Sequence, residues 1–197
     1  QKQLNTFYGE VPTQEKRPEK NYSSILNKVD LDTFVKGVKK GKWLSFDLET
    51  TSVEPMLCDI VGLSFSTQAD SGVYIPIQYK EKESSNFGGE DLMAVLEILK
   101  PVFENESIPK TGQNVKFDAL ILKRHGVDVK GIKFDTLLAA HLLKPESRTL
   151  KLDNLSMDHL NYRMIPIEDL IGKGKNRITM AEVELDKITF YAAEDAD

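Results

Sequence analysis

The sequence has few of the features that mark secreted, disulfide-bonded or membrane proteins. Cys58 is its only cysteine, so no disulfide can form within the chain, and this usage favours a reducing cytoplasm. No apolar run approaches the ~18 residues that a membrane span needs. The polar stretch over residues 1–20 also has no signal-peptide core. We therefore expect a cytoplasmic protein that does not associate with a membrane.

The sequence also has no excess of positive charge. Lys and Arg number 26 against 31 Asp and Glu, which gives a net charge of −5 and a pI of about 5.4. A dedicated nucleic-acid binder usually has the opposite balance. A protein that holds nucleic acid by a broad basic surface is thereby excluded. A nuclease whose site is itself made of carboxylates stays possible, with its affinity supplied by bound cations or by another domain.

The length and the local composition predict one domain with a tail. The chain has 197 residues, enough to bury a substantial core. Residues 1–26 are rich in Lys, Glu, Pro, Asn and Ser without a sustained period, which is typical of a linker or disordered tail. Residues 27–197 are expected to form the domain. The chain stops at Asp197 within a helical pattern, so we expect a fragment of a longer polypeptide.

Hydrophobic periodicity predicts an α/β domain. Short apolar runs with turn residues between them predict an antiparallel meander of three strands, and two further short strands follow later in the chain. Helical spacing of apolar residues separates and follows these strands. The expected architecture is a mixed sheet of about five strands flanked by helices. The predicted strands are 43–47, 60–65, 73–77, 108–112 and 132–134, and the predicted helices are 30–40, 90–104, 114–125, 136–143 and most of the chain after 150, apart from a loop at 172–177.

Two carboxylates stand at the end of the first apolar strand. Asp47 and Glu49 are two residues apart, and the two-residue period of a strand points both side chains to one face. Taken alone, the pair could also be two solvated carboxylates at the end of a strand, without any function. The pattern becomes informative only together with others.

Two helices carry polar pairs at a spacing of four residues. Asn114 and Asp118 share one face of the helix at 114–125, and Tyr191 and Asp195 share one face of the last helix. Each pair has a plain structural alternative. Asn114 could cap its helix, Asp118 could complement the helix dipole, and Tyr191 could be a partly buried tyrosine beside an exposed aspartate.

In this order and in these elements, the three pairs resemble the motifs of the exonuclease superfamily that is named for its four acidic residues, in its tyrosine branch. The resemblance extends over residues 43–197. It implies a ribonuclease-H-like α/β fold. Four further matches resemble the proofreading 3′→5′ exonuclease domain of bacterial family A DNA polymerases, the polymerase I type: residues 47–51, 111–114, 134–136 and 171–176.

The resemblance implies hydrolysis of phosphodiesters with two divalent ions, Mg²⁺ or Mn²⁺. Such ions prefer oxygen ligands, which agrees with a carboxylate-rich site without a Cys or His cluster. By resemblance, Asp47, Glu49 and Asp195 hold the first ion, Asp47 bridges to the second, and Asp118 reaches the second through water. Tyr191 would orient the attacking water.

The resemblance also implies the substrate contacts and the partners. Thr50 and Val53 are expected to contact the terminal nucleotide, and Gln113, Asn114 and Phe117 to line the path of the strand. Val53 stands where the family usually has leucine. The expected partners are the 3′ end of single-stranded or frayed DNA and a polymerase domain C-terminal in the same chain. We expect a monomer located in the cytoplasm, at the bacterial nucleoid.

Two alternatives stay open at this point. A free-standing 3′ exoribonuclease of the ribonuclease D type would share the motifs, and RNA against DNA substrates would separate the two. An exonuclease fold kept only as an inactive DNA-binding scaffold is the other, although all four acids and the tyrosine are intact. Outside the motifs, Asp135 is predicted to cap the helix that follows it, and Cys58 to be a small buried or boundary residue.

Overall fold

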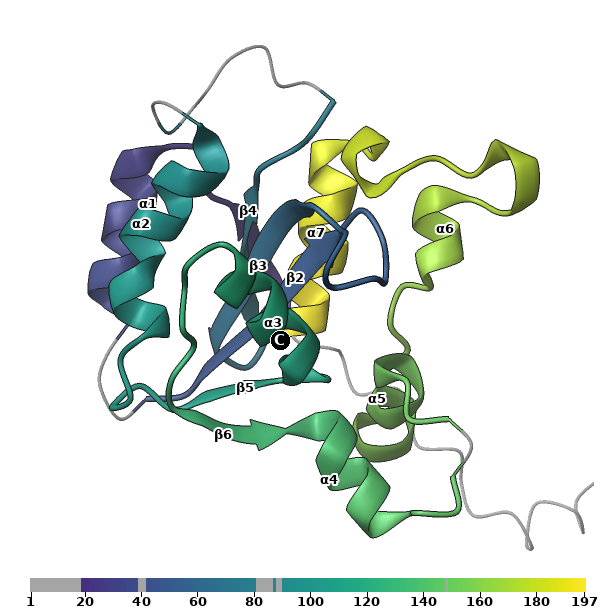
Figure 1. Ribbon diagram of the computed structural model, residues 1–197. Coiled ribbons are helices and arrows are strands. Elements are labelled where there is room, and N and C mark those ends of the chain that lie inside the picture. The colour runs from purple at the N-terminus through teal and green to yellow at the C-terminus, as the bar shows by residue number, and fades with distance from the viewer. Residues whose placement is uncertain (1–18, 39–41, 81–86, 88–89, 148) are drawn as a thin grey trace, which may run out of the picture.

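The computed structural model describes residues 19–197 apart from 39–41, 81–86, 88–89 and residue 148. Its centre is a six-stranded mixed sheet in the order β1-β4-β3-β2-β5-β6 (Figure 1). β2, β3 and β4 form an antiparallel meander, as predicted, whereas β1 pairs with β4, β5 with β2, and β6 with β5 in parallel.

Up to residue 143 the elements fall close to the predicted ranges, whereas the chain after residue 150 was predicted to be helical with one loop at 172–177 and is also interrupted at 161–166. The strands are β1 (Asn21–Ser24), β2 (Leu44–Thr50), β3 (Ile60–Gln68), β4 (Ser71–Pro76), β5 (Lys110–Gly112) and β6 (Ile132–Asp135). The helices are α1 (Lys28–Gly37), α2 (Asp91–Phe103), α3 (Val115–Arg124), α4 (Thr136–Leu143), α5 (Leu152–Leu160), α6 (Ile167–Ile171) and α7 (Leu185–Ala196), with 3-10 turns at Gly174–Asn176 and Met180–Glu182.

The sheet separates two apolar cores. Alternation along β2 sends Leu44, Phe46 and Leu48 into the larger core, which is completed by apolar side chains of α1, α2 and α3. The smaller core lies on the other face, where Ile188 and Ala192 of α7 pack with side chains of β3 and β4. Figure 1 shows α1 and α2 on one side of the sheet and α7 on the other. The odd-numbered positions of β2 therefore face α7.

The prediction of five strands and of a tail over residues 1–26 was wrong in part. Asn21–Ser24 forms β1, a sixth strand at the edge of the sheet, although residues 1–18 lie outside the described part of the chain. β1 is polar and alternates between exposed and partly buried positions, so it gives no apolar signal in the sequence. Contacts made elsewhere hold it: its backbone pairs with β4, and the ring of Tyr22 packs edge-on against Phe190 of α7 at 4.9 Å.

α7 lies unusually close to β4, and a glycine makes the approach possible. A Cβ atom on Gly72 would stand 2.9 Å from the carbonyl oxygen of Ala193, closer than such atoms pack. Ala192 and Ala193 are themselves fully buried against the sheet. The small residues at 192 and 193 thus let α7, which carries Tyr191 and Asp195, lie directly on the sheet.

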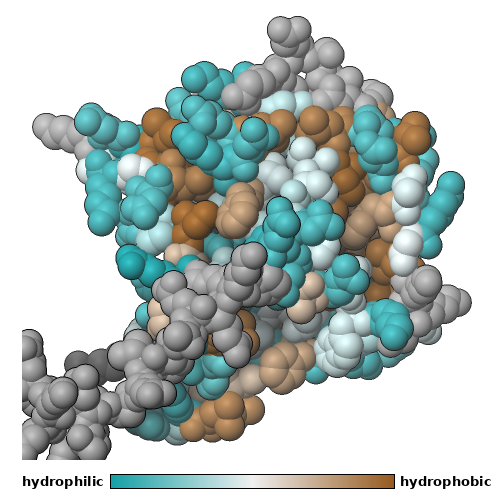
Figure 2. Space-filling model, turned by 180° about the vertical axis from the view of Figure 1, so that it is seen from behind, coloured by the Kyte–Doolittle hydropathy of each residue, from teal (hydrophilic) through white to brown (hydrophobic). Residues whose placement is uncertain are grey.

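Within the described residues, no helix is both long enough and apolar enough to cross a membrane. Figure 2 shows the face seen from behind, where apolar side chains reach the surface in patches among polar ones. The prediction that Cys58 is buried is confirmed, since only 1% of its surface is exposed.

Candidate active site

β2 presents the first two carboxylates on the α7 face of the sheet. Asp47 lies opposite Ser64 of β3 and Glu49 opposite Gly62, before a register shift that ends the regular pairing at Thr50. Gly62 has no side chain to compete for this space, and the ring of Tyr74 lies where its Cβ would stand. Glu49 is consequently 7% exposed and lies beneath the surface of the site.

α7 brings Tyr191 and Asp195 onto the same side. The two residues are one helical turn apart, and burial, followed by the charge of Asp195, raises the pKa of the Tyr191 phenol. Tyr191 is partly buried and packs against the smaller core. The phenol is therefore held by apolar contacts on the helix face that also carries Asp195.

Three carboxylates meet where β2 and α7 touch. One oxygen from each of Asp47, Glu49 and Asp195 lies within 4.8 Å of the other two. Glu49 is buried, whereas Asp47 and Asp195 keep part of their surface accessible. The structure thus joins residues that are separated by about 150 positions in the sequence, as the motif pattern implied.

The cluster is electrostatically unfavourable without a cation. Although Asp47 as a residue is partly exposed, its carboxyl group is enclosed, and the loss of water raises its pKa to about 7. Burial, followed by repulsion from Asp47, raises the pKa of both Glu49 and Asp195 well above the usual range. Among the described residues, Oε1 of Glu49 is buried and has no hydrogen-bond partner. Such a group of oxygens fits a hard divalent cation, which would supply both the missing charge and the missing partner.

The fourth acid, Asp118, lies outside this group of three. It is 2% exposed on the first turn of α3, and burial followed by the charge of Asp47 raises its pKa. Asp118 is therefore close enough to Asp47 to interact with it, but its carboxylate does not join the 4.8 Å cluster. A role at one remove, through water, is consistent with this arrangement.

Asp135 fixes the start of the helix that carries Asp118. As predicted, it caps α4 by accepting hydrogen bonds from the backbone N–H groups of Leu137 and Leu138 at 2.9 and 3.2 Å. The same carboxylate also accepts from the N–H groups of Asn114 and Val115 at 3.1 and 2.9 Å. One buried side chain therefore caps two helices, and the second of these caps was not predicted.

Asn114 occupies the N-cap position of α3 but does not cap the helix with its side chain. Its backbone is in the left-handed region, with φ of 55°, which asparagine tolerates better than most residues. Because Asp135 takes over the capping role, the exposed side chain of Asn114 is left available to a ligand.

The remaining predicted substrate residues differ in how free they are. Val53 is 85% exposed in the loop after β2, and the hydroxyl of Thr50 donates to the carbonyl of Ser52 at 2.9 Å. Phe117 is partly buried and packs against the larger core. Gln113 donates its amide to the carbonyl of Leu150 at 2.7 Å, which ties the segment before α5 to the end of β5.

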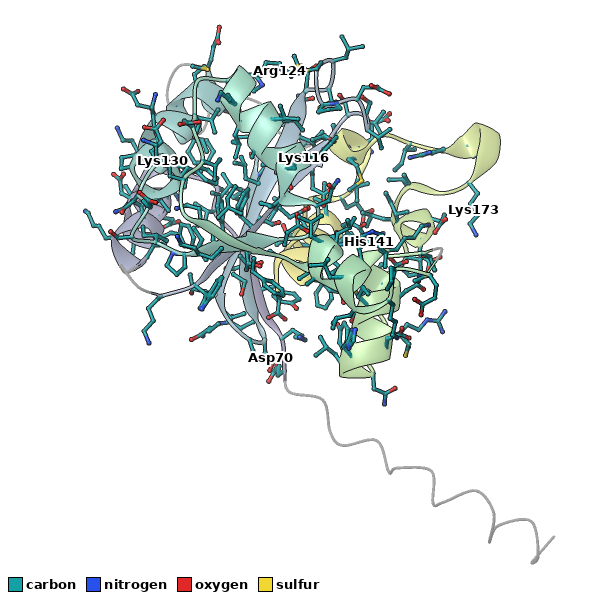
Figure 3. All side chains as sticks on the ribbon, turned by 60° about the horizontal axis from the view of Figure 1, so that its bottom comes forward. Asp70, Lys116, Arg124, Lys130, His141 and Lys173 are labelled. Carbon is teal, nitrogen blue, oxygen red and sulfur yellow. The ribbon has the colours of Figure 1, made fainter. Side chains whose placement is uncertain are left out.

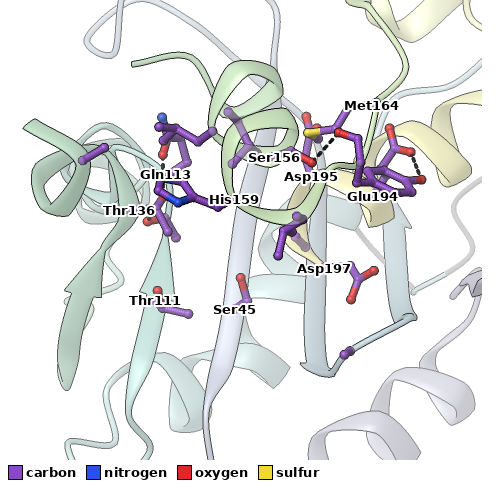
Figure 4. A pocket seen from close by; sticks show the side chains of 18 of the residues that line it. Ser45, Thr111, Gln113, Thr136, Ser156, His159, Met164, Glu194, Asp195 and Asp197 are labelled. Atoms are coloured by element: carbon purple, nitrogen blue, oxygen red, sulfur yellow. Dashed lines mark hydrogen bonds between the residues drawn. The ribbon is translucent and has the colours of Figure 1, made fainter. Parts of the chain in front are cut away.

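A cavity of about 740 Å³ adjoins the carboxylates on the α7 side. Figure 4 shows Asp195, Glu194 and Met164 close together on one side of it, with Gln113, Thr136 and Thr111 on the other. Glu194 is buried and accepts hydrogen bonds from the hydroxyl of Tyr162 at 2.5 Å and from the N–H group of Ile165 at 2.8 Å. These bonds hold the segment between α5 and α6 against the helix that carries Asp195.

Sequence reasoning missed three residues that shape the site, namely Glu194, Tyr162 and Arg124. Glu194 follows the small residues of the last motif directly, and its position next to Asp195 was the only available signal. Arg124 ends α3, and its partners lie in a distant loop. No local pattern pointed to that contact.

The fold and the carboxylate cluster together define a nuclease of the exonuclease type. A family model described as 3′–5′ exonuclease matches residues 22–197. The chain belongs to this family and is therefore an enzyme of the nuclease class. The match starts within β1, in agreement with the place of that strand in the domain.

The curated relatives are DNA polymerases I. The chain is 30% identical to DNA polymerase I of Pseudomonas aeruginosa over 181 residues, which is 91% of this chain and 20% of the relative. It is 36% identical to that of Borreliella burgdorferi over 179 residues, or 89% of this chain and 18% of the relative. The chain thus spans about a fifth of the length of these relatives.

Solved structures support the fold. Escherichia coli RNase D, an exoribonuclease involved in structured RNA processing, matches with a TM-score of 0.63 at 14% identity, covering 89% of this chain and 41% of that one. Brucella melitensis NrnC with bound Mg²⁺ matches with a TM-score of 0.60 at 15% identity, covering 90% of this chain and 75% of that one. At these identities the likeness establishes the shared fold and not the substrate.

Proposed function

We propose that this domain hydrolyses the terminal phosphodiester at the 3′ end of single-stranded or frayed DNA and releases 5′-mononucleotides. In the full protein it would proofread for a DNA polymerase of the polymerase I type, with the polymerase domain C-terminal in the same chain, in the bacterial cytoplasm. The observation that carries the proposal is the meeting of Asp47, Glu49 and Asp195 within 4.8 Å. The polymerase I relatives favour DNA as the substrate.

The carboxylates are proposed to hold two divalent cations, Mg²⁺ or Mn²⁺. Asp47, Glu49 and Asp195 would ligate one ion directly, with Asp47 shared between both ions and Asp118 acting through water. Bound there, the ions supply positive charge for the phosphate and lower the pKa of water. The buried Oε1 of Glu49 supports this assignment, because it has no hydrogen-bond partner in the described part of the chain and burying such an oxygen is costly.

The protein's own groups would orient the reactants. The hydroxyl of Tyr191 is proposed to orient the attacking water by a hydrogen bond. Burial and the neighbouring carboxylates raise the pKa of this phenol, so it stays protonated and serves as a positioning group and not as a base. We propose that the terminal nucleotides are contacted by Thr50, Val53, Gln113, Asn114 and Phe117.

The test is digestion of 5′-labelled single-stranded DNA by the purified domain, with and without Mg²⁺, beside RNA of the same sequence. We expect a ladder that shortens from the 3′ end, depends on the metal and forms faster with DNA. Faster digestion of RNA would instead favour an exoribonuclease. Binding of the DNA without any shortening, at saturating Mg²⁺ and Mn²⁺, would point to an inactive scaffold.

A further inference from the structure

The loop that joins β2 to β3 has a defined shape. Its neck is closed by two hydrogen bonds, from the N–H of Thr51 to the carbonyl of Asp59 at 3.0 Å and from the N–H of Asp59 to the hydroxyl of Thr51 at 2.9 Å. Within it, the N–H groups of Leu57 and Cys58 both donate to the carbonyl of Glu54 at 2.9 Å. A loop bonded in this way presents its side chains in fixed directions.

The same loop exposes three large apolar side chains. Val53 is 85%, Met56 63% and Leu57 81% exposed, whereas the neighbouring Cys58 is buried. Single exposed apolar residues need no explanation, but three within five positions of an ordered loop are typical of an interaction surface. The loop begins directly after Thr50, so its neck continues the strand that carries Asp47 and Glu49.

Arg124 ties the tip to a second element of the site. It is the last residue of α3, and its Nη1 donates to the carbonyl of Pro55 at 2.8 Å while its Nη2 donates to the carbonyl of Cys58. The planar guanidinium thus spans the turn that bears Met56 and Leu57. Figure 3 shows Arg124 and Lys116 along α3, the helix that also carries Asp118.

The two attachments have different consequences. The neck fixes the loop to β2, where Asp47 and Glu49 lie, and Arg124 fixes the tip to α3. Arg124 bonds only to backbone carbonyls of the loop, so these contacts fix the position of the loop backbone and do not depend on which side chains the loop carries. The partly buried guanidinium gives two of its five N–H groups to these carbonyls.

We propose that Arg124 is a positioning residue, which holds Val53, Met56 and Leu57 against the unstacked bases of the strand end that enters the site. This inference rests on the proposed function. Apolar side chains can pack on the face of any base, so the contact would tolerate every sequence. It would also favour ends whose bases are already unpaired, because only these expose their faces.

The experiment compares Arg124→Ala and Arg124→Lys with Val53→Ala, the double variant Arg124→Ala/Val53→Ala, and Lys123→Ala as a matched control. Lys123 precedes Arg124 on α3 and forms an exposed ion pair with Asp128 at 3.5 Å. Its replacement by alanine removes the same charge as Arg124→Ala. Steady-state digestion of single-stranded DNA gives KM and kcat separately. Anisotropy of a fluorescent single-stranded oligonucleotide in Ca²⁺ measures binding without cleavage. The thermal shift on adding Mn²⁺ reports the metal site.

We expect Arg124→Ala to raise KM and weaken binding roughly tenfold, with kcat and the Mn²⁺ shift little changed. Arg124→Lys, which can reach one carbonyl, should be intermediate, and Lys123→Ala should match the wild type. Because Arg124 acts through the loop, the double variant should lose little more than Arg124→Ala alone. Unchanged KM, fully additive losses, or a fall in kcat with a smaller Mn²⁺ shift would each overturn the inference.

Two further outcomes are separable. A wild-type domain that binds the oligonucleotide without cleaving it would refute the proposed activity, yet the anisotropy arm would still decide the role of Arg124. If Arg124→Ala does not fold, as judged by circular dichroism, Arg124→Lys carries the same comparison. Binding by Arg124→Lys equal to that of the wild type would then count against the proposal.

Discussion

Replacing Asp135 by alanine should destabilise the domain more than an ordinary helix cap would. Its carboxylate accepts from four backbone N–H groups, those of Asn114, Val115, Leu137 and Leu138, at 2.9–3.2 Å. Loss of one N-cap costs about 1 kcal/mol, with a range of roughly 0.5–2. Two caps lost together, at a side chain only 9% exposed, should therefore cost about 2–4 kcal/mol.

For a domain of this size, 1 kcal/mol corresponds to a change of roughly 2–4 °C in Tm, so we expect Asp135→Ala to melt about 5–15 °C lower. Asp135→Asn should lose less, about 1–2 kcal/mol, since its amide retains one oxygen but places a donor opposite the N–H of Val115. The assay is thermal unfolding followed by circular dichroism, with Asp128→Ala as the surface control. A Tm for Asp135→Ala within 2 °C of that of the control would refute the reasoning.

Three further predictions concern the site. Asp47→Ala should reduce hydrolysis by several orders of magnitude while the metal-free domain melts at the same temperature or higher, because repulsion within the cluster is relieved; near-normal hydrolysis at saturating Mn²⁺ would contradict the assignment. Tyr191→Phe should slow turnover roughly 10–10³-fold, as for loss of one positioning hydrogen bond, with the Mn²⁺-induced rise in Tm unchanged; a reduced rise would make Tyr191 a support for the ligands. Burial raises the pKa of Asp47 to about 7, so the folded state retains a proton that the unfolded state releases, and metal-free stability should be greatest at acidic pH and fall as pH rises through about 7. Thermal melts from pH 5 to 8 test this, and a stability that rises over that range without metal would contradict it.

Most of the secondary structure could be predicted from the sequence because its determinants are local. Short apolar runs between turn residues identified β2, β3 and β4, and helical spacing of apolar residues identified α1 and α2. β1 could not be predicted in this way. Its four residues owe their strand conformation to the backbone of β4 and to Phe190, which lies about 170 positions later in the chain.

The same distinction applies to the site. Spacings of two and four residues predicted that Asp47 shares a face with Glu49, and Tyr191 with Asp195. The structure brings the three carboxylates into one cluster, and their charges contribute to the raised pKa of Tyr191. Local spacing cannot predict which side chain bonds to a segment that is distant in the sequence. Arg124 bonds to carbonyls 66 and 69 positions away, so its role depends on the packing of α3 against the loop.

Gln113 shows how such contacts constrain a residue that was predicted to bind the strand. One N–H of its amide is committed to the carbonyl of Leu150, and its Oε1 accepts from the hydroxyl of Thr136. A glutamine amide has two N–H donors and two acceptor lone pairs, so one donor and one lone pair are left. Gln113 can therefore contact a nucleotide without releasing Leu150. The bonds that occupy half of its amide also fix the direction of the other half, so the proposed contact with a strand would be made in one orientation.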